Sequence, residues 1–280
     1  MKKQQVVVVS VAFGLLILLF FFGKTVNPNN KQVAGNQSSN SNSEINITEL
    51  LKHAKERLTP EQAKTVISLE NSVIRGNVKD QQIATFKQLA SFWKDSVGIF
   101  EPYVYYISEA SKLENSEKSL TFAAHLFLSN LKVENNPALQ HWLATNAKVL
   151  FKKAYEINPN NDSTKVGLGA CYLFGNISNN PMEGITLIRN VIQKDSTNTF
   201  AQMMLALGSL KSNQLDKAIE RFLIVLSYEP NNLEAAINLA ETFEKIGDNT
   251  NSIKWYEFVK AKMKNKEIIA ELDNRIKQLK

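Results

Sequence analysis

The 34 residues from Thr199 to Asn232 read TFAQMMLALGSLKSNQLDKAIERFLIVLSYEPNN, and the next 34, Leu233 to Lys266, read LEAAINLAETFEKIGDNTNSIKWYEFVKAKMKNK. The two stretches align without a gap. Small residues and large apolar residues recur at the same offsets: Leu205 with Leu239, Ala206 with Ala240, Ala218 with Ser252, Phe222 with Tyr256, and Val225 with Val259. Each stretch therefore contains two amphipathic helical segments, interrupted at Asn213-Gln214 in the first and at Gly247-Asp248 in the second.

The preceding block, residues 162–198, fits the same register with three extra residues in its turn, FGNISNNPME. Its helix positions are taken by Leu168, Gly169 and Tyr172 and then by Gly184, Ile188 and Val191. Within that turn, Asn180 is the expected N-cap and Pro181 the expected first helical residue. Pro-Asn-Asn closes the segments at 159–161 and 230–232, but it also occurs at 28–30 after no amphipathic run. The register, and not the tripeptide, therefore defines the repeat boundary.

Three consecutive units, 162–198, 199–232 and 233–266, resemble tetratricopeptide repeats, which pair two antiparallel helices every 34 residues. The resemblance implies an all-α solenoid of helix pairs. An open solenoid needs a capping element at its end. We expect residues 267–280 to form that capping helix, because one helical face carries its apolar residues, Ile268, Ile269, Leu272, Ile276 and Leu279.

Upstream, the period is less clear, and we interpret residues 44–161 as degenerate helix pairs that resemble the same repeats. The expected helices are Asn46–Leu58, Pro60–Arg75, Asp80–Ser96, Pro102–Leu113, Ser119–Leu131 and Pro137–Asn158. Thr59 and Gln62 have the spacing of a capping box at one helix start. The aromatic stretch from Phe92 to Tyr106 is expected to form the core of this half, with a second recognition surface as the alternative.

The N-terminus carries a long apolar run, Val6 to Phe22, in which only Ser10 is polar. As a helix its 17 residues span roughly 25 Å, against about 30 Å of bilayer hydrocarbon. We therefore expect a single N-terminal transmembrane helix within residues 1–23; a cleaved signal peptide, with Lys2 and Lys3 before it, is the alternative. Residues 24–43, rich in Asn, Ser and Gln, are expected to be a disordered linker.

The positive charges before the run favour a cytoplasmic N-terminus and an extracytoplasmic remainder. The pattern of one anchor followed by repeats is similar to bacterial envelope-anchored tetratricopeptide repeat proteins. That resemblance implies a single-pass protein of the bacterial inner membrane, held through residues 6–22, with its C-terminal domain in the periplasm.

No catalytic, cofactor-binding or metal-binding motif stands out. His53, His125 and His141 do not have helical ligand spacing, and Gly167 and Gly169 lie inside an expected repeat helix. The single cysteine, Cys171, excludes an intramolecular disulfide within the chain. A net charge of +6 is compatible with ordinary solubility. We expect a protein that is not an enzyme, with no cofactor, no metal, no nucleic-acid partner and no small-molecule substrate.

The resemblance implies that a protein or peptide partner binds on the concave face, which the first helix of each unit lines. The matching positions are Ser163, Val166, Ala170 and Leu173, then Phe200, Met203, Leu207 and Leu210, then Glu234, Ile237, Glu241 and Glu244. The family's Lys, Asn and Arg clamp for a C-terminal carboxylate has no counterpart here, because these positions are apolar or acidic. The candidate groove therefore suits an amphipathic or basic peptide and consists of Val166, Phe200, Met203, Leu207, Leu210, Ile237, Glu241 and Glu244.

These observations favour a membrane-tethered interaction scaffold or adaptor on the extracytoplasmic side. The main alternative is a cytosol-facing import or chaperone co-receptor with the opposite topology. A hydrolase without a recognisable motif and a nucleic-acid-binding protein are weaker alternatives.

Overall fold

The structure of the protein is a computed structural model that describes residues 45–75, 78–178 and 180–280. Over these ranges the chain forms helices and no strand, which confirms the all-α fold class. The expected transmembrane segment at 6–22 and the linker at 24–43 lie outside the described residues. Among the helices that are described, none has the length and apolar character needed to cross a membrane.

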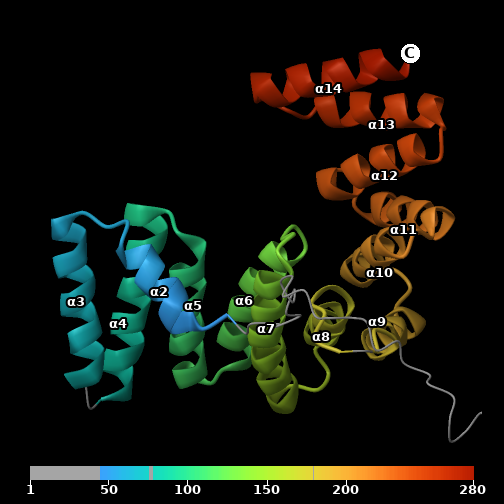
Figure 1. The fold of residues 1–280 in the computed structure, drawn as a ribbon. Coiled ribbons are helices and arrows are strands. Elements are labelled where there is room, and N and C mark those ends of the chain that lie inside the picture. The colour runs from blue at the N-terminus through green and yellow to red at the C-terminus, as the bar shows by residue number, and fades with distance from the viewer. Residues whose placement is uncertain (1–44, 76–77, 179) are drawn as a thin grey trace, which may run out of the picture. The chain divides into compact units, whose positions relative to one another are not determined.

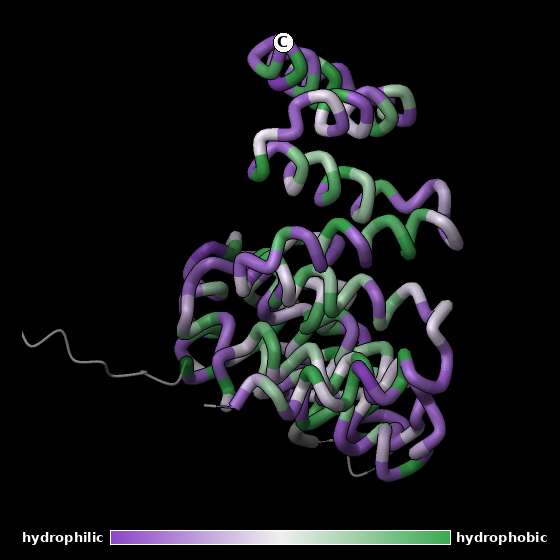
Figure 2. Tube along the Cα trace, turned by 90° about the vertical axis from the view of Figure 1, so that its right-hand side faces the viewer, coloured by the Kyte–Doolittle hydropathy of each residue, from purple (hydrophilic) through white to green (hydrophobic). Residues whose placement is uncertain are grey.

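The C-terminal part is built from helix pairs in the expected register (Figure 1). The first pair is α8 (Asp162–Phe174) with α9 (Met182–Lys194), the second α10 (Thr199–Lys211) with α11 (Leu215–Tyr228), and the third α12 (Leu233–Lys245) with α13 (Asn249–Lys260). A last helix, α14 (Lys266–Leu279), packs on α13. Figure 2 shows hydrophobic and hydrophilic residues alternating along these helices, as amphipathic helices require.

The recurring Asn before each pair has a structural role. The side chains of Asn161, Asn198 and Asn232 each accept a hydrogen bond from the backbone N–H three residues ahead, at 3.2, 2.9 and 2.9 Å. Each thereby satisfies one of the otherwise unpaired N–H groups at a helix start. Asn180 likewise accepts from the N–H of Met182 at 3.2 Å, although α9 begins one residue later than expected, after Pro181.

The turns within the pairs lie where the sequence predicts them. Asn213 has φ +56° and Gly247 has φ +80°, so both occupy the left-handed region that ends a helix. In the longer turn of the first pair, Asn176 adopts the same conformation with φ +51°.

Within each pair, the helices cross at their smallest residues. A Cβ added to Gly169 of α8 would lie 2.6 Å from the carbonyl oxygen of Gly184 in α9. The backbones of the two helices are therefore in direct contact. The equivalent positions of the second pair are Ala206 and Ala218, and those of the third pair are Ala240 and Ser252; all four residues are small and fully buried.

The N-terminal helices form a second, smaller core. They are α2 (Ile47–Lys55), α3 (Pro60–Arg75), α4 (Lys79–Ser91), the π-helical η1 (Phe92–Val97) and α5 (Phe100–Glu114). Their buried residues include Trp93 and Tyr106, as expected for the aromatic stretch. The helix expected at 80–96 changes to π-helical geometry at Phe92 and ends at Gly98, which has φ +74°.

The capping box before α3 is confirmed. The backbone N–H of Thr59 donates to Gln62 Oε1 at 3.0 Å, and the N–H of Gln62 donates to Thr59 Oγ1 at 3.3 Å. Two N–H groups at the start of α3 are thus satisfied reciprocally.

The backbone contact between α8 and α9 generates a testable prediction. Gly169→Ala places a methyl group against the carbonyl of Gly184, and we expect it to lower the free energy of unfolding by about 2 kcal/mol or more. Gly208→Ala is the matched control, because its Cβ would meet the flexible end of the Leu173 side chain at 2.6 Å. Urea unfolding followed by circular dichroism measures both. Equal losses in the two variants would contradict the proposed crossing.

Candidate functional site

The residues expected to line the concave groove lie at different depths. Val166 has no exposed surface and Met203 is 5% exposed, so these two side chains belong to the hydrophobic core. Phe200, Leu207 and Leu210 are half-buried and pack against that core. The candidate groove on the described surface therefore does not include Val166 or Met203.

A helix from the upstream half covers the beginning of the inner helices. This helix, α6 (Glu117–Leu131), pairs with α7 (Pro137–Ile157), close to the expected bounds. One face of α6 contacts the first turns of α8 and α10. Its contacts are Glu117 with Asn161, Thr121 Oγ1 with Thr164 Oγ1 at 3.3 Å, His125 Nε2 with Ser163 Oγ at 2.9 Å, and the ring of His125 with that of Phe200 at 5.3 Å.

The C-terminal end of α6 reaches the third pair. Lys132, which caps α6, forms an ion pair with Glu234 in the first turn of α12 at 2.7 Å. These two residues are 102 positions apart, and Lys132 is only 19% exposed. Side chains of α6 and of its capping residue thus reach the first turns of α8, α10 and α12, and the ring of His125 packs against that of Phe200, so the chain itself occupies part of this end of the inner surface.

An open groove of about 540 Å³ lies at the other end of the repeats. Ile237 and Glu241 of α12, both expected from the sequence, form one wall together with Tyr256 of α13. The opposite wall comes from α14 and consists of Ile268, Glu271, Leu272, Asn274, Arg275 and Gln278. The amphipathic pattern of residues 267–280 predicts only a capping helix and not this wall; the exposed Ile268 on its apolar face is the sequence signal that indicates a binding surface.

One end of the groove is fixed by a charged cluster. Arg275 contacts both carboxylate oxygens of Glu244, with Nη2–Oε1 at 2.7 Å and Nε–Oε2 at 2.9 Å, and the Tyr256 hydroxyl donates to Oε2 at 2.8 Å. Burial alone would raise the pKa of Glu244, but the hydrogen bonds from Arg275 and Tyr256 outweigh it and lower that pKa. Burial, followed by the bond to Glu244, raises the pKa of Tyr256. Glu244 is thus committed to an internal contact.

Two other carboxylates in the groove are free. Glu241 and Glu271 are exposed and form no ion pair with any described residue. The apolar surface where the two walls meet, here called the floor, includes the half-buried Ile237 of α12 and the buried Leu272 of α14. This arrangement can hold apolar side chains on its floor and cations at its rim.

The described residues offer no arrangement for metal or thiol chemistry. Over 45–75, 78–178 and 180–280, no three His, Cys, Asp or Glu side chains gather closely enough to hold a metal ion. Cys171 is buried in α8, and burial raises the pKa of its thiol, which disfavours the reactive thiolate.

No protein-family model matches the chain, and no curated protein matches it. Several solved structures are similar to this chain. One is a MamA fragment that begins at residue 41, from Desulfovibrio magneticus RS-1; its sequence identity is 16% and its TM-score 0.40, and the match covers 63% of this chain and 92% of that chain. YrrB, described as a TPR protein with an unusual peptide-binding site, has 14% identity, a TM-score of 0.41, and coverage of 74% and 97%. A tetratricopeptide repeat protein from Parabacteroides merdae has 14% identity, a TM-score of 0.40, and coverage of 78% and 86%. At such low similarity, the site of this chain is defined by its own contacts.

The contact between α6 and the repeats predicts a pH dependence. Burial, and then the positive charge of Lys132, lower the pKa of His125 below its ordinary value of about 6.5. The unfolded chain therefore binds a proton at this residue more readily than the folded chain, and stability falls as pH drops below about 6.5. We expect His125→Gln to lose less stability than the wild type between pH 7.5 and 5.5, measured by urea unfolding at each pH.

The exposed His53 supplies the matched control, because His53→Gln removes a histidine without touching the α6 contact. All other titratable groups are the same in the three proteins, so their contributions to the pH dependence of stability cancel in the comparison. An identical pH profile for wild type and His125→Gln would contradict this role of His125.

Proposed function

We propose that the protein is an interaction scaffold whose groove between α12 and α14 binds a basic, amphipathic peptide segment of a partner protein. The observation that carries this proposal is the pair of exposed, unpaired carboxylates Glu241 and Glu271 above an apolar floor. Apolar side chains on one face of the segment would occupy the floor, and flanking Lys or Arg would pair with the carboxylates. We propose no catalytic role and no resident cofactor or metal.

The same groove is poorly suited to a C-terminal carboxylate. Its one arginine, Arg275, already contacts both oxygens of Glu244. A free carboxylate entering the groove would meet two further acidic side chains without a free cation to bind it. A basic segment is therefore favoured over the acidic terminus of a partner.

In this proposal the parts of the chain have distinct roles. Residues 1–23 anchor the protein, with a signal peptide as the alternative, and 24–43 form the tether. Residues 44–161 provide the upstream helix pairs, 162–266 three repeat units divided at 198 and 232, and 267–280 a cap that also lines the groove. The tether would raise the local concentration of the groove near the membrane surface.

The binding proposal predicts the effect of reversing both free carboxylates. We expect the full chain to bind a synthetic amphipathic Leu/Lys peptide with blocked ends and to bind the Leu/Glu counterpart weakly. Glu241→Lys combined with Glu271→Lys should lower the affinity for the Leu/Lys peptide about tenfold, because two exposed ion pairs of up to about 1 kcal/mol each are replaced by repulsion. Fluorescence anisotropy of a labelled peptide measures the change.

The matched control combines Glu156→Lys and Glu183→Lys. These residues are exposed and unpaired within the described chain and lie outside the groove, so the control makes the same change in net charge. Equal weakening by the control and by the groove variant would show non-specific charge attraction and contradict the proposal.

Sidedness is a separate proposal. The charges around residues 6–22 favour a C-terminal domain in the periplasm of a bacterial cell, with a cytosol-facing co-receptor as the alternative. We expect trypsin added to intact spheroplasts to degrade residues 45–280 while a cytoplasmic marker stays intact. Protection of the domain until the cells are lysed would favour the cytosol-facing alternative.

A further inference from the structure

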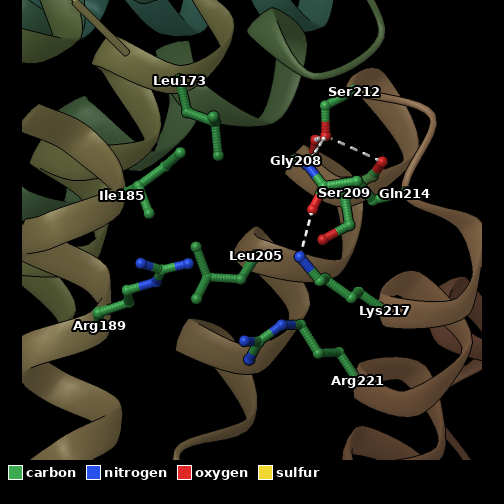
Figure 3. A pocket seen from close by; sticks show the side chains of 10 residues that line it. All are labelled: Leu173, Ile185, Arg189, Leu205, Gly208, Ser209, Ser212, Gln214, Lys217 and Arg221. Atoms are coloured by element: carbon green, nitrogen blue, oxygen red, sulfur yellow. Dashed lines mark hydrogen bonds between the residues drawn. The ribbon is translucent and has the colours of Figure 1, made fainter. Parts of the chain in front are cut away.

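A small basic pocket lies between the first and second helix pairs, away from the proposed peptide groove. Its volume is about 60 Å³. Figure 3 shows Arg189 of α9 on one side of the pocket and Lys217 and Arg221 of α11 on the other. Its polar lining is completed by Ser209, Ser212 and Gln214. Among the described residues, no Asp or Glu lines this pocket.

None of the three cations forms an ion pair with a residue that the structure describes. Lys217 Nζ donates to Gln214 Oε1 at 2.7 Å, and Arg221 Nη1 donates to Gln202 Oε1 at 2.7 Å. Gln202 is only 3% exposed, and its own amide donates to the Ser196 carbonyl at 3.0 Å, which fixes the acceptor. Arg189 forms no hydrogen bond or ion pair within the described chain. Neutral partners thus orient Lys217 and Arg221, and the charges of all three residues remain available.

Such a concentration of like charge has an electrostatic cost in the absence of an anion. Burial lowers the pKa of Arg221, the neighbouring carboxylate of Glu220 opposes this shift, and Arg189 adds to it. An anion between the two guanidinium groups would reverse the repulsion, and guanidinium groups bind phosphate oxygens through paired N–H donors. A dianion matches three cations better than a monoanionic carboxylate does.

An apolar cleft adjoins the basic pocket. Its volume is about 380 Å³, and it shares Leu173, Ile185, Gly208, Ser212 and Gln214 with the pocket. Beyond the shared residues, Tyr172 and Pro181 add apolar surface, whereas Asn176, Ser178 and Lys211 add polar groups; Lys211 Nζ donates to the backbone carbonyl of Phe174 at 3.2 Å. A ligand with its anionic group at the arginines would therefore place the remainder of its structure against apolar side chains.

We propose that this pocket binds a phosphate monoester whose organic body is apolar or aromatic. The phosphate lies between Arg189 and Arg221, with Lys217 as the third cation, and the body lies in the cleft beside Tyr172, Leu173 and Ile185. The site is formed by α8, α9, α10 and α11, none of which lines the peptide groove, so it does not depend on the proposed scaffold function.

Phenyl phosphate is the test ligand, titrated calorimetrically into the full 280-residue chain. We expect saturable binding that is at least tenfold tighter than that of inorganic phosphate or of benzoate. Arg189→Gln should lower the affinity for phenyl phosphate about tenfold or more, because a charge-assisted pair of hydrogen bonds is lost. Arg189 is exposed and has no partner among the residues that the structure describes, so this variant is expected to keep the wild-type unfolding midpoint in urea.

Arg57→Gln is the matched control, since Arg57 is an exposed arginine outside the pocket. The Glu241→Lys, Glu271→Lys variant should bind phenyl phosphate as the wild type does, which separates the two sites. Absence of saturable binding, or equal affinity in the wild type and Arg189→Gln, overturns the proposal. Benzoate binding as tightly as phenyl phosphate overturns the phosphate assignment, and inorganic phosphate binding as tightly overturns the role of the cleft.

Discussion

The close crossing of two helices within each repeat is the contact on which the rest of the structure depends. At Gly169 and Gly184 the backbones of α8 and α9 touch, and the equivalent positions of the next pairs hold the fully buried small residues Ala206 and Ala218, then Ala240 and Ser252. Small residues at the crossing let larger side chains such as Phe222 and Tyr256 fill the space on either side of it. The crossing therefore sets the distance between the two helices of each pair.

The repeats could be predicted from the sequence because their determinants are local and periodic. The alignment of Leu205 with Leu239 gave the register, and the turns at Asn213 and Gly247 followed from it. The position of α6 could not be predicted in this way. Its contacts with Phe200 and Glu234 join residues far apart in the chain, and such contacts leave no periodic signal in either segment.

The candidate groove was predicted only in part, for a related physical reason. Helical register indicates which side of a helix faces inward, but the depth of each side chain is set by its neighbours. Ile237 therefore lines an open groove, whereas Met203, one repeat earlier, is buried. The second wall of the groove comes from α14, whose amphipathic pattern identifies a helix but does not show that its apolar edge remains partly uncovered.

The path of α6 alters how neighbouring repeats depend on one another. In a simple one-dimensional array, each unit contacts only the units before and after it, so fraying at one end leaves distant units unaffected. Here one helix and its capping residue contact three pairs: Thr121 contacts the first, His125 the second and Lys132 the third. Local opening of the third pair therefore breaks the ion pair between Lys132 and Glu234, so this array contains contacts beyond those between adjacent units.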